Sequence, residues 1–364
     1  MIVFLYITSF VINTIGVVKE NKILIFDILT LLIISFLLGR GANTPDTYNY
    51  YIGYVNSLHL NLNETFEPGY LILQKISHYF KLDYVSFRLL LSFLCFLLIR
   101  STIIKFTSNP HFVYLYFLLF LIFINTEQIR NFFAFSIIVY GFRFLINNSL
   151  RGKIKYLVTV LLACTIHITS LIYIIFIFVS FKNRKYFIRL IVITTLFLCI
   201  FIYIGGNNLS FIREIINSFD SGSGKYDAYI EGQTKLGFLY AFLLHFYNIY
   251  IVSYSRNILK ASNLDTNKNA FVELIYWINL ISIVFFPLFM LNLQFIRLVR
   301  NLLIVNYIVF SFLPRSSVKL KRKSIYIQLM ILINTFLWFY YTFIIQDHID
   351  DILIPFFDNS IFSS

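Results

Sequence analysis

Charged residues are scarce in this sequence. Asp, Glu, Lys and Arg make up 13% of the 364 residues, whereas 59% are hydrophobic, and this share of charge is about half that of soluble domains. Apolar stretches of about 20 residues recur along the chain, and each is long enough to cross a bilayer core roughly 30 Å thick. The composition excludes a soluble globular domain and predicts a single all-α, polytopic membrane domain over residues 1–364.

Cysteine is rarer still, and its placement argues against metal or disulfide chemistry. Cys95, Cys164 and Cys199 lie inside apolar stretches, without CxxC spacing or nearby histidine pairs. We therefore expect no disulfide framework and no metal site. The sequence also lacks a glycine-rich phosphate loop and an evident internal repeat, so an ATP-driven pump has no support. The start, MIVFLYITSF, lacks a basic region and a cleavage motif, and we expect this first apolar stretch to be retained.

Acidic residues are fewer than basic ones, 17 against 30, and the net charge of +13 is unevenly distributed. Six linkers are strongly basic, as cytoplasmic loops are: residues 19–22, 100–105, 151–155, 182–189, 256–268 and 315–323. The loops between them are mixed or acidic. The excess charge therefore follows membrane topology, and no basic stripe remains to bind nucleic acid.

This alternation predicts ten crossings with both chain ends outside. The predicted spans are residues 2–18, 23–39, 84–104, 111–125, 132–148, 186–204, 237–255, 271–291, 295–313 and 324–345. The outward loops 40–83 and 205–236 and the tail 346–364 are long enough to carry a site. Residues 68–80, PGYLILQKISHYF, predict a short interfacial helix with proline in its first turn. Residues 211–218 predict another helix, followed by a Gly/Ser hinge at 221–224.

The apolar segment 156–181 does not fit this alternation, because basic residues flank both of its ends. A re-entrant hairpin that enters from the cytoplasm, turns near residues 165–169 and returns would keep both flanks inside. Alternatively, residues 68–81 form an extra short crossing and 156–181 spans once. The sequence leaves both topologies open, and we expect about ten or eleven transmembrane helices plus a possible re-entrant hairpin.

Polar side chains near the membrane gather on the predicted outward side, and each needs a partner or a function because burial there is costly. The candidates are Arg40, Asp46, Tyr48, Tyr51, Glu67, Arg130, Arg297 and Arg300, together with His167, which lies at the deep turn of segment 156–181 and could approach them. An arginine-rich cavity suits an anionic, lipid-linked substrate, since guanidinium groups bind phosphate oxygens and stabilise a departing pyrophosphate. A carboxylate or a histidine can accept the proton of an attacking hydroxyl.

Several of these residues also have purely structural interpretations. Arg40 could extend from a span to the headgroups, Glu127 and Arg130 could pair as i, i+3 neighbours, and a lone histidine in an apolar run is commonly a core residue. Tyrosines commonly anchor a helix at the interface. Arg297 and Arg300 are harder to explain in this way, because like charges on one helix face repel unless an anion or carboxylate lies between them.

The order of these residues resembles that of the EpsG/Wzy-type polymerases of bacterial surface polysaccharides. The matching motifs are Arg40 after an early span, Asp46-Thr47-Tyr48, Glu67-Pro68, IRNFFAFSI with Arg130 and Ala134, IHITSL with His167 and Ser170, and a span running from Arg297 to Pro314. Asn131 departs from the glutamine that is usual in the family. The resemblance covers roughly residues 25–315.

The resemblance implies an all-α, GT-C-like glycosyltransferase of the bacterial inner membrane that polymerises O-antigen or a related polysaccharide. Such enzymes join oligosaccharide repeat units carried on undecaprenyl pyrophosphate at the outer face of that membrane. The pyrophosphate is the leaving group, so no nucleotide sugar, metal or other cofactor is expected. The expected partners are the lipid-linked oligosaccharides, membrane lipids and a chain-length regulator, with no nucleic acid.

Charge and position suggest a role for each candidate. Arg130, Arg297 and Arg300 would hold the donor pyrophosphate, and Arg40 would orient it or a second lipid phosphate. The general base would be His167, Asp46 or Glu67, and the sequence does not rank them. Tyr48 and Tyr51 could stack on sugar rings.

Two other functions remain open at this point. An O-antigen ligase-like glycosyltransferase would need a similar outward cavity. A non-enzymatic flippase or transporter of lipid-linked oligosaccharides typically has paired halves with polar groups along a central pathway, whereas the polar groups here gather on one side.

Overall fold

The computed structural model describes residues 1–19, 23–41, 44–59, 67–204, 236–262, 264–313 and 318–358. Every regular element within these residues is a helix, which confirms the predicted all-α class. Among the described residues, seven helical segments are long and apolar enough to cross a membrane, so the protein is a multi-pass membrane protein. The helix and hinge predicted within 211–224 lie outside the described residues.

Each of the ten predicted spans coincides with a helical segment, with boundaries shifted by a few residues. Six are single helices: α1 (Ile2–Lys19), α2 (Leu24–Gly39), α5 (Tyr84–Phe106), α8 (Ile129–Leu145), α10 (Arg184–Ile204) and α13 (Phe238–Lys260). The others change helix type along their length: α6 (Pro110–Tyr116), η1 (Phe117–Leu121) and α7 (Ile122–Glu127); α14 (Thr266–Ile281), η3 (Ser282–Phe285) and α15 (Phe286–Leu291); η4 (Leu293–Ile296), α16 (Arg297–Arg300) and α17 (Leu303–Phe310); and α18 (Val318–Tyr340) with η5 (Tyr341–Ile345).

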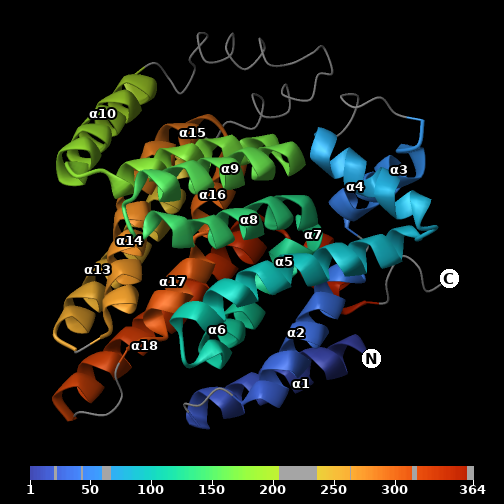
Figure 1. Ribbon diagram of the computed structural model, residues 1–364, viewed down its shortest axis with the longest axis horizontal. Coiled ribbons are helices and arrows are strands. Elements are labelled where there is room, and N and C mark those ends of the chain that lie inside the picture. The colour runs from blue at the N-terminus through green and yellow to red at the C-terminus, as the bar shows by residue number, and fades with distance from the viewer. Residues whose placement is uncertain are drawn as a thin grey trace.

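The N-terminus lies at one end of the bundle, at the right of Figure 1, together with α3 (Pro45–Asn56) and α4 (Pro68–Tyr79). The aromatic rings of Tyr6 and Phe356 are in edge contact there, with centroids 6.2 Å apart. Proline occupies the first turn of both short helices, where its missing N–H costs nothing. We call this the outward end, because the loop charges predict that it faces outside.

Residues 156–181 belong to a hairpin. Its arms are α9 (Leu150–Ile166) and η2 (Ile168–Ser180), and the chain turns at His167, whose backbone is extended. Halfway along, the Tyr156 hydroxyl donates to the Tyr173 carbonyl at 2.7 Å. Both ends of the hairpin line one cavity, through Asn148 and Phe181. The alternative of one straight crossing is therefore wrong, and α4 is no extra crossing but packs against α9 near the hairpin tip (Figure 1).

The second arm is a 3-10 helix of 13 residues, far longer than most helices of this type. Three residues per turn place every third side chain in a straight row. The buried row consists of Ser170, Tyr173, Phe176 and Val179, whereas Ile168, Leu171 and Ile174 are exposed. At about 2.0 Å per residue η2 is about 26 Å long, which matches the 17 residues of α9 at about 1.5 Å each.

The opposite end of the bundle is fixed by a buried carboxylate. Asp27 of α2 accepts from Arg100 Nε of α5 at 3.1 Å and from the Tyr114 hydroxyl of α6 at 2.8 Å. Nearby, Arg143 of α8 donates to the hydroxyls of Ser101 and Thr102. These bonds join α2, α5, α6 and α8. We call this the basic end, because its linkers are basic.

The hairpin makes a topology prediction. In a cysteine-free background, Asn147→Cys and Asn183→Cys should react with an impermeant maleimide from the same side of the membrane, because both flank the base of the hairpin. Tyr48→Cys, at the outward end, should react from the other side. Labelling of intact and permeabilised cells measures this, and opposite sidedness of positions 147 and 183 would contradict the hairpin.

Candidate functional site

Glu67 joins three distant parts of the chain at the outward end. It immediately precedes Pro68 of α4, and its side chain is 13% exposed. One carboxylate oxygen accepts from Arg130 at 2.7 Å. The other lies 3.3 Å from His167 Nδ1 and accepts the backbone N–H of Ile168 at 3.0 Å. The loop before α4, the start of α8 and the hairpin tip therefore meet at one carboxylate, and three of the candidate residues come together there.

The Glu67 carboxylate is ionised. Burial alone would raise its pKa, but the hydrogen bond from His167, the positive charge of Arg130 and the Ile168 N–H outweigh burial and lower the pKa to about 2. An ionised carboxylate only accepts hydrogen bonds, so Nδ1 of His167 carries a proton. The neutral ring then has its lone pair on Nε2, which is buried and has no hydrogen-bond partner among the described residues. This nitrogen is available to accept a proton.

Arg130 lies at the start of α8, buried between aromatic rings. Its guanidinium carbon is 5.7 Å from the ring centroid of Tyr50 and 5.9 Å from that of Tyr70, within the range of cation–π contacts. The sequence suggested a pair with Glu127, but the structure pairs Arg130 with Glu67. Next to it, the amide nitrogen of Asn131, which replaces the family's glutamine, is buried without a hydrogen-bond partner among the described residues.

Arg297 and Arg300 form the two ends of α16. Arg300 is buried and donates to the Gln128 side chain at 2.8 Å, which brings α16 beside the start of α8. Tyr173 ties the hairpin to the same segment, since its hydroxyl donates to the Leu298 carbonyl at 3.2 Å. The two arginines and the Glu67 cluster are thus held through one hairpin.

Asp46 lies in the first turn of α3. Burial raises the pKa of its carboxyl, and the charges of Arg130 and Arg297 only partly oppose this. These electrostatic contributions place Asp46 in the same region as both arginines. Tyr48 and Tyr51 are 56% and 36% exposed, and Tyr50 instead occupies the place beside Arg130, so sugar stacking by the two exposed tyrosines stays a prediction.

Arg40 is tied to the C-terminal segment. Its guanidinium donates to the carbonyls of Phe356 and Asp358 and lies 5.3 Å from the Phe356 ring centroid. Burial and the charge of Arg88 lower its pKa to about 10. These bonds cap the end of α19 (Ile354–Phe357). Arg40 therefore holds the tail in this structure, and its action on a lipid phosphate stays a prediction.

The C-terminal segment itself reaches the site, through η6 (Ile349–Leu353). Burial lowers the pKa of His348. The charge of Asp351 opposes this shift, whereas the charge of Arg300 adds to it. Phe356 packs edge-on against Phe123 at 4.8 Å between centroids. The predicted outward tail thus covers the helix that ends at Glu127.

Sequence reasoning missed Arg88, which is fully buried in α5. It donates to the Thr47 hydroxyl at 3.1 Å, and to the carbonyls of Leu38 and Thr126 at 3.3 and 2.7 Å. Those carbonyls are among the last of α2 and α7, where helices lack internal donors and favour a cation. One signal was present in the sequence: an arginine one turn inside an apolar span. Arg88 positions the helix ends that carry Arg40 and Glu127.

These features define a polytopic membrane protein with an arginine-rich polar site at one end of its helix bundle. No group of three metal-ligating side chains occurs among the described residues, and the expectation of no cofactor stays a prediction. The sequence model of the EpsG family matches residues 23–356, and the chain belongs to this family. Membership supports a polysaccharide polymerase-type function in general. No curated protein and no solved structure matches the chain.

Arg88→Met should destabilise the protein, because carbonyls at two helix ends lose their donor. Leaving buried acceptors unpaired costs about 1–3 kcal/mol each, so we expect a loss of roughly 2–4 kcal/mol, and a smaller one for Arg88→Lys. Thermal unfolding in detergent measures this. Arg143→Met, which removes donors to two hydroxyls at the basic end, is the control, and an Arg88→Met variant as stable as the control would contradict the capping role.

The Glu67 carboxyl should make stability depend on acid pH. Because the pKa of this carboxyl is lowered in the folded protein, its ionisation stabilises the fold fully at pH values above the ordinary pKa of 4.5. That stabilisation is lost as the pH falls through about 2. The full shift corresponds to about 3 kcal/mol. The unfolding temperature of the wild type should therefore fall between pH 4.5 and 2 more steeply than that of Glu67→Gln. The control is Asp350→Asn, which changes an exposed carboxylate and should follow the wild type. If the unfolding temperatures of the wild type and Glu67→Gln fell in parallel with pH, the lowered pKa of Glu67 would be refuted.

Proposed function

We propose that this protein is a glycosyltransferase that joins undecaprenyl-pyrophosphate-linked repeat units into O-antigen or a related surface polysaccharide, at the outer face of the bacterial inner membrane. The observation that carries the proposal is the meeting of Glu67, Arg130 and His167 at one carboxylate, with the Arg297/Arg300 segment held beside it. This arrangement combines a proton acceptor with cations, the two requirements for glycosyl transfer from a pyrophosphate.

The arginines favour an anionic substrate. Arg300 is buried and bonds to the amide oxygen of Gln128 rather than to a carboxylate. Neutral acceptors solvate a guanidinium but leave its charge uncompensated, and buried charge without a counter-charge is costly. A pyrophosphate would supply that counter-charge. Arg297 is half-buried, and we assign to it direct contact with the leaving group.

His167 is the preferred general base. Glu67 is ionised and already accepts three hydrogen bonds, so its role is to orient the imidazole and stabilise its protonated form. The acceptor hydroxyl would attack the anomeric carbon, the bond from that carbon to the pyrophosphate oxygen would break, and the hydroxyl proton would pass to His167 Nε2. Asp46, whose pKa is raised, is the second candidate for the base.

Arg297→Ala should abolish polymerisation while leaving expression intact, because the departing pyrophosphate loses its direct cation. His167→Gln should lower turnover by about 10²–10⁴-fold, more than Asp46→Asn does. The measurement is the glycan ladder of a deletion strain complemented with each variant. Arg189→Ala, an exposed arginine of α10, is the matched control.

Long-chain glycan persisting in Arg297→Ala would overturn the arginine assignment. Two other results would change the reaction class. A deletion strain that attaches no repeat unit at all would indicate a ligase, whereas one that retains single units is expected of a polymerase. A flippase would be indicated if the purified protein did not turn over lipid-linked units in detergent but moved them across the membrane of vesicles.

A further inference from the structure

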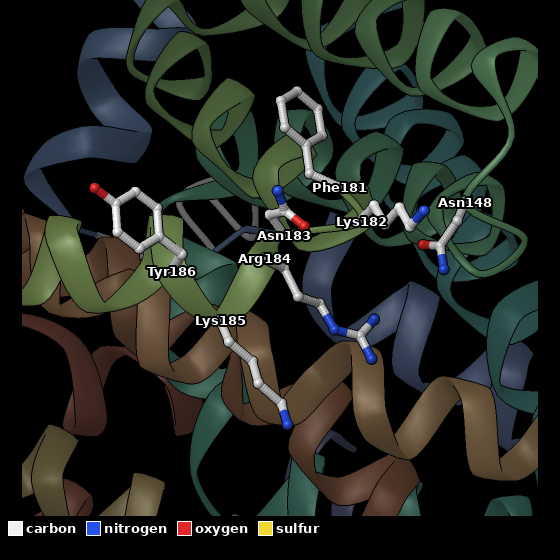
Figure 2. Close-up of a pocket in the computed structure, with 7 residues that line it drawn as sticks. All are labelled: Asn148, Phe181, Lys182, Asn183, Arg184, Lys185 and Tyr186. Atoms are coloured by element: carbon white, nitrogen blue, oxygen red, sulfur yellow. The ribbon is translucent and has the colours of Figure 1, made fainter.

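A cavity of about 630 Å³ lies at the basic end, at the base of the hairpin whose tip carries His167. Figure 2 shows the side chains around it, which come from Asn148 just before the hairpin, from the turn between η2 and α10, and from the first turn of α10. Its volume lies within the range of small-ligand sites. None of the residues assigned to the outward site lines this cavity.

Cationic side chains dominate the cavity. Lys182, Arg184 and Lys185 line it, and none of the three forms an ion pair with a described residue. Lys153 adds a fourth charge, 4.4 Å from the ring centroid of Phe181, another lining residue. Four cationic side chains therefore line the cavity or contact a residue that lines it.

Local carboxylates do not neutralise these charges. The sequence has no Asp or Glu between Glu127 and Glu214. The Arg184 guanidinium lies 5.6 Å from the Trp277 ring centroid on α14, but Glu273, one turn earlier on that helix, is bonded by Arg256 and Lys260. The lining of the cavity therefore carries positive charge, which favours an anionic ligand.

An apolar face continues from the cavity along α10. Tyr186, which lines the cavity, Leu190, Ile193 and Phe197 follow at helical spacing on one side and are 68%, 51%, 58% and 74% exposed. In a membrane helix such a face meets acyl chains. A soluble anion would use the cations alone, whereas a phospholipid would use both the cations and the apolar face.

We propose that this cavity binds the phosphate headgroup of an anionic phospholipid, with an acyl chain along the Tyr186–Phe197 face of α10. Arginine and lysine recognise the headgroup phosphate by charge-assisted hydrogen bonds, and basic pockets at the cytoplasmic side attract anionic lipids. The lipid would offset the mutual repulsion of the cations and hold the start of α10 against the base of the hairpin. The inference does not depend on the proposed polymerase activity.

Native mass spectrometry of the full-length protein, titrated in detergent with phosphatidylglycerol, tests the proposal. The variant Lys182→Gln/Arg184→Gln/Lys185→Gln should bind at least about tenfold more weakly, since it loses two or more charge-assisted contacts. The control Lys19→Gln/Lys260→Gln/Lys268→Gln removes the same charge elsewhere at the basic end and should bind like the wild type. Phosphatidylcholine should bind weakly to all three proteins.

Equal weakening in both triple variants would overturn the proposal, because it would indicate non-specific attraction to surface charge. Displacement of the lipid by inorganic phosphate at equal concentration would also overturn it, in favour of a soluble-anion site. Leu190→Ser/Phe197→Ser keeps every cation and should weaken binding of the long-chain lipid but not of a dibutyryl analogue. Unchanged binding of the long-chain lipid would refute the assigned acyl path. Unfolding temperatures identify any variant that is misfolded.

Discussion

The carboxylate of Glu67 accepts hydrogen bonds from Arg130, from the His167 ring and from the Ile168 backbone, groups up to 101 residues away in the sequence. A nearly buried ion pair is stable only when its remaining lone pairs are also satisfied, and the two donors of the hairpin tip meet that condition. Without the carboxylate, the hairpin tip would lose its ionic link to the start of α8, and α4 and α8 would keep the cation–π contact of Arg130 with Tyr70. The imidazole would also lose the acceptor that sets its tautomer, so the placement of the proton-accepting nitrogen depends on this one group.

Apolar stretches separated by charged linkers were a sufficient guide to the helical segments, because each stretch buries its side chains wherever its neighbours pack. The side of the bilayer that each linker faces stays a prediction from loop charge. The same rule indicated the hairpin at 156–181, since clusters at 151–155 and 182–185 belong on one side. It could not select the hairpin over a straight crossing, because that choice depends on how the second arm packs. The period-three row of Ser170, Tyr173, Phe176 and Val179 lies in a run so apolar that the sequence shows no period.

The candidate site was less predictable than the spans. The order of motifs along the chain identified Glu67, Arg130 and His167 as candidates. It did not predict that Arg130 and His167 both contact the Glu67 carboxylate, so that Arg130 pairs with Glu67 and not with its neighbour Glu127. A hydrogen bond to a backbone carbonyl cannot be predicted from the sequence, because every residue type carries that carbonyl. Arg88 bonds to the carbonyls of Leu38 and Thr126, and Arg40 to that of Asp358; each pairing depends on where a helix ends. Buried arginines near helix C-termini are thus better explained by missing donors than by missing carboxylates.

The break in the hairpin at His167 explains how one carboxylate can serve two adjacent donors. In a continuous α-helix, the N–H of Ile168 would donate to the carbonyl four residues earlier. Because α9 ends at Ile166 and His167 is extended, that N–H is among the first, unsatisfied donors of η2. Glu67 accepts it from outside the helix, at the terminus where a negative charge is favoured. The same extended residue presents its ring to the same oxygen. Ending the helix at this point therefore orients the histidine and satisfies the new helix terminus with a single side chain.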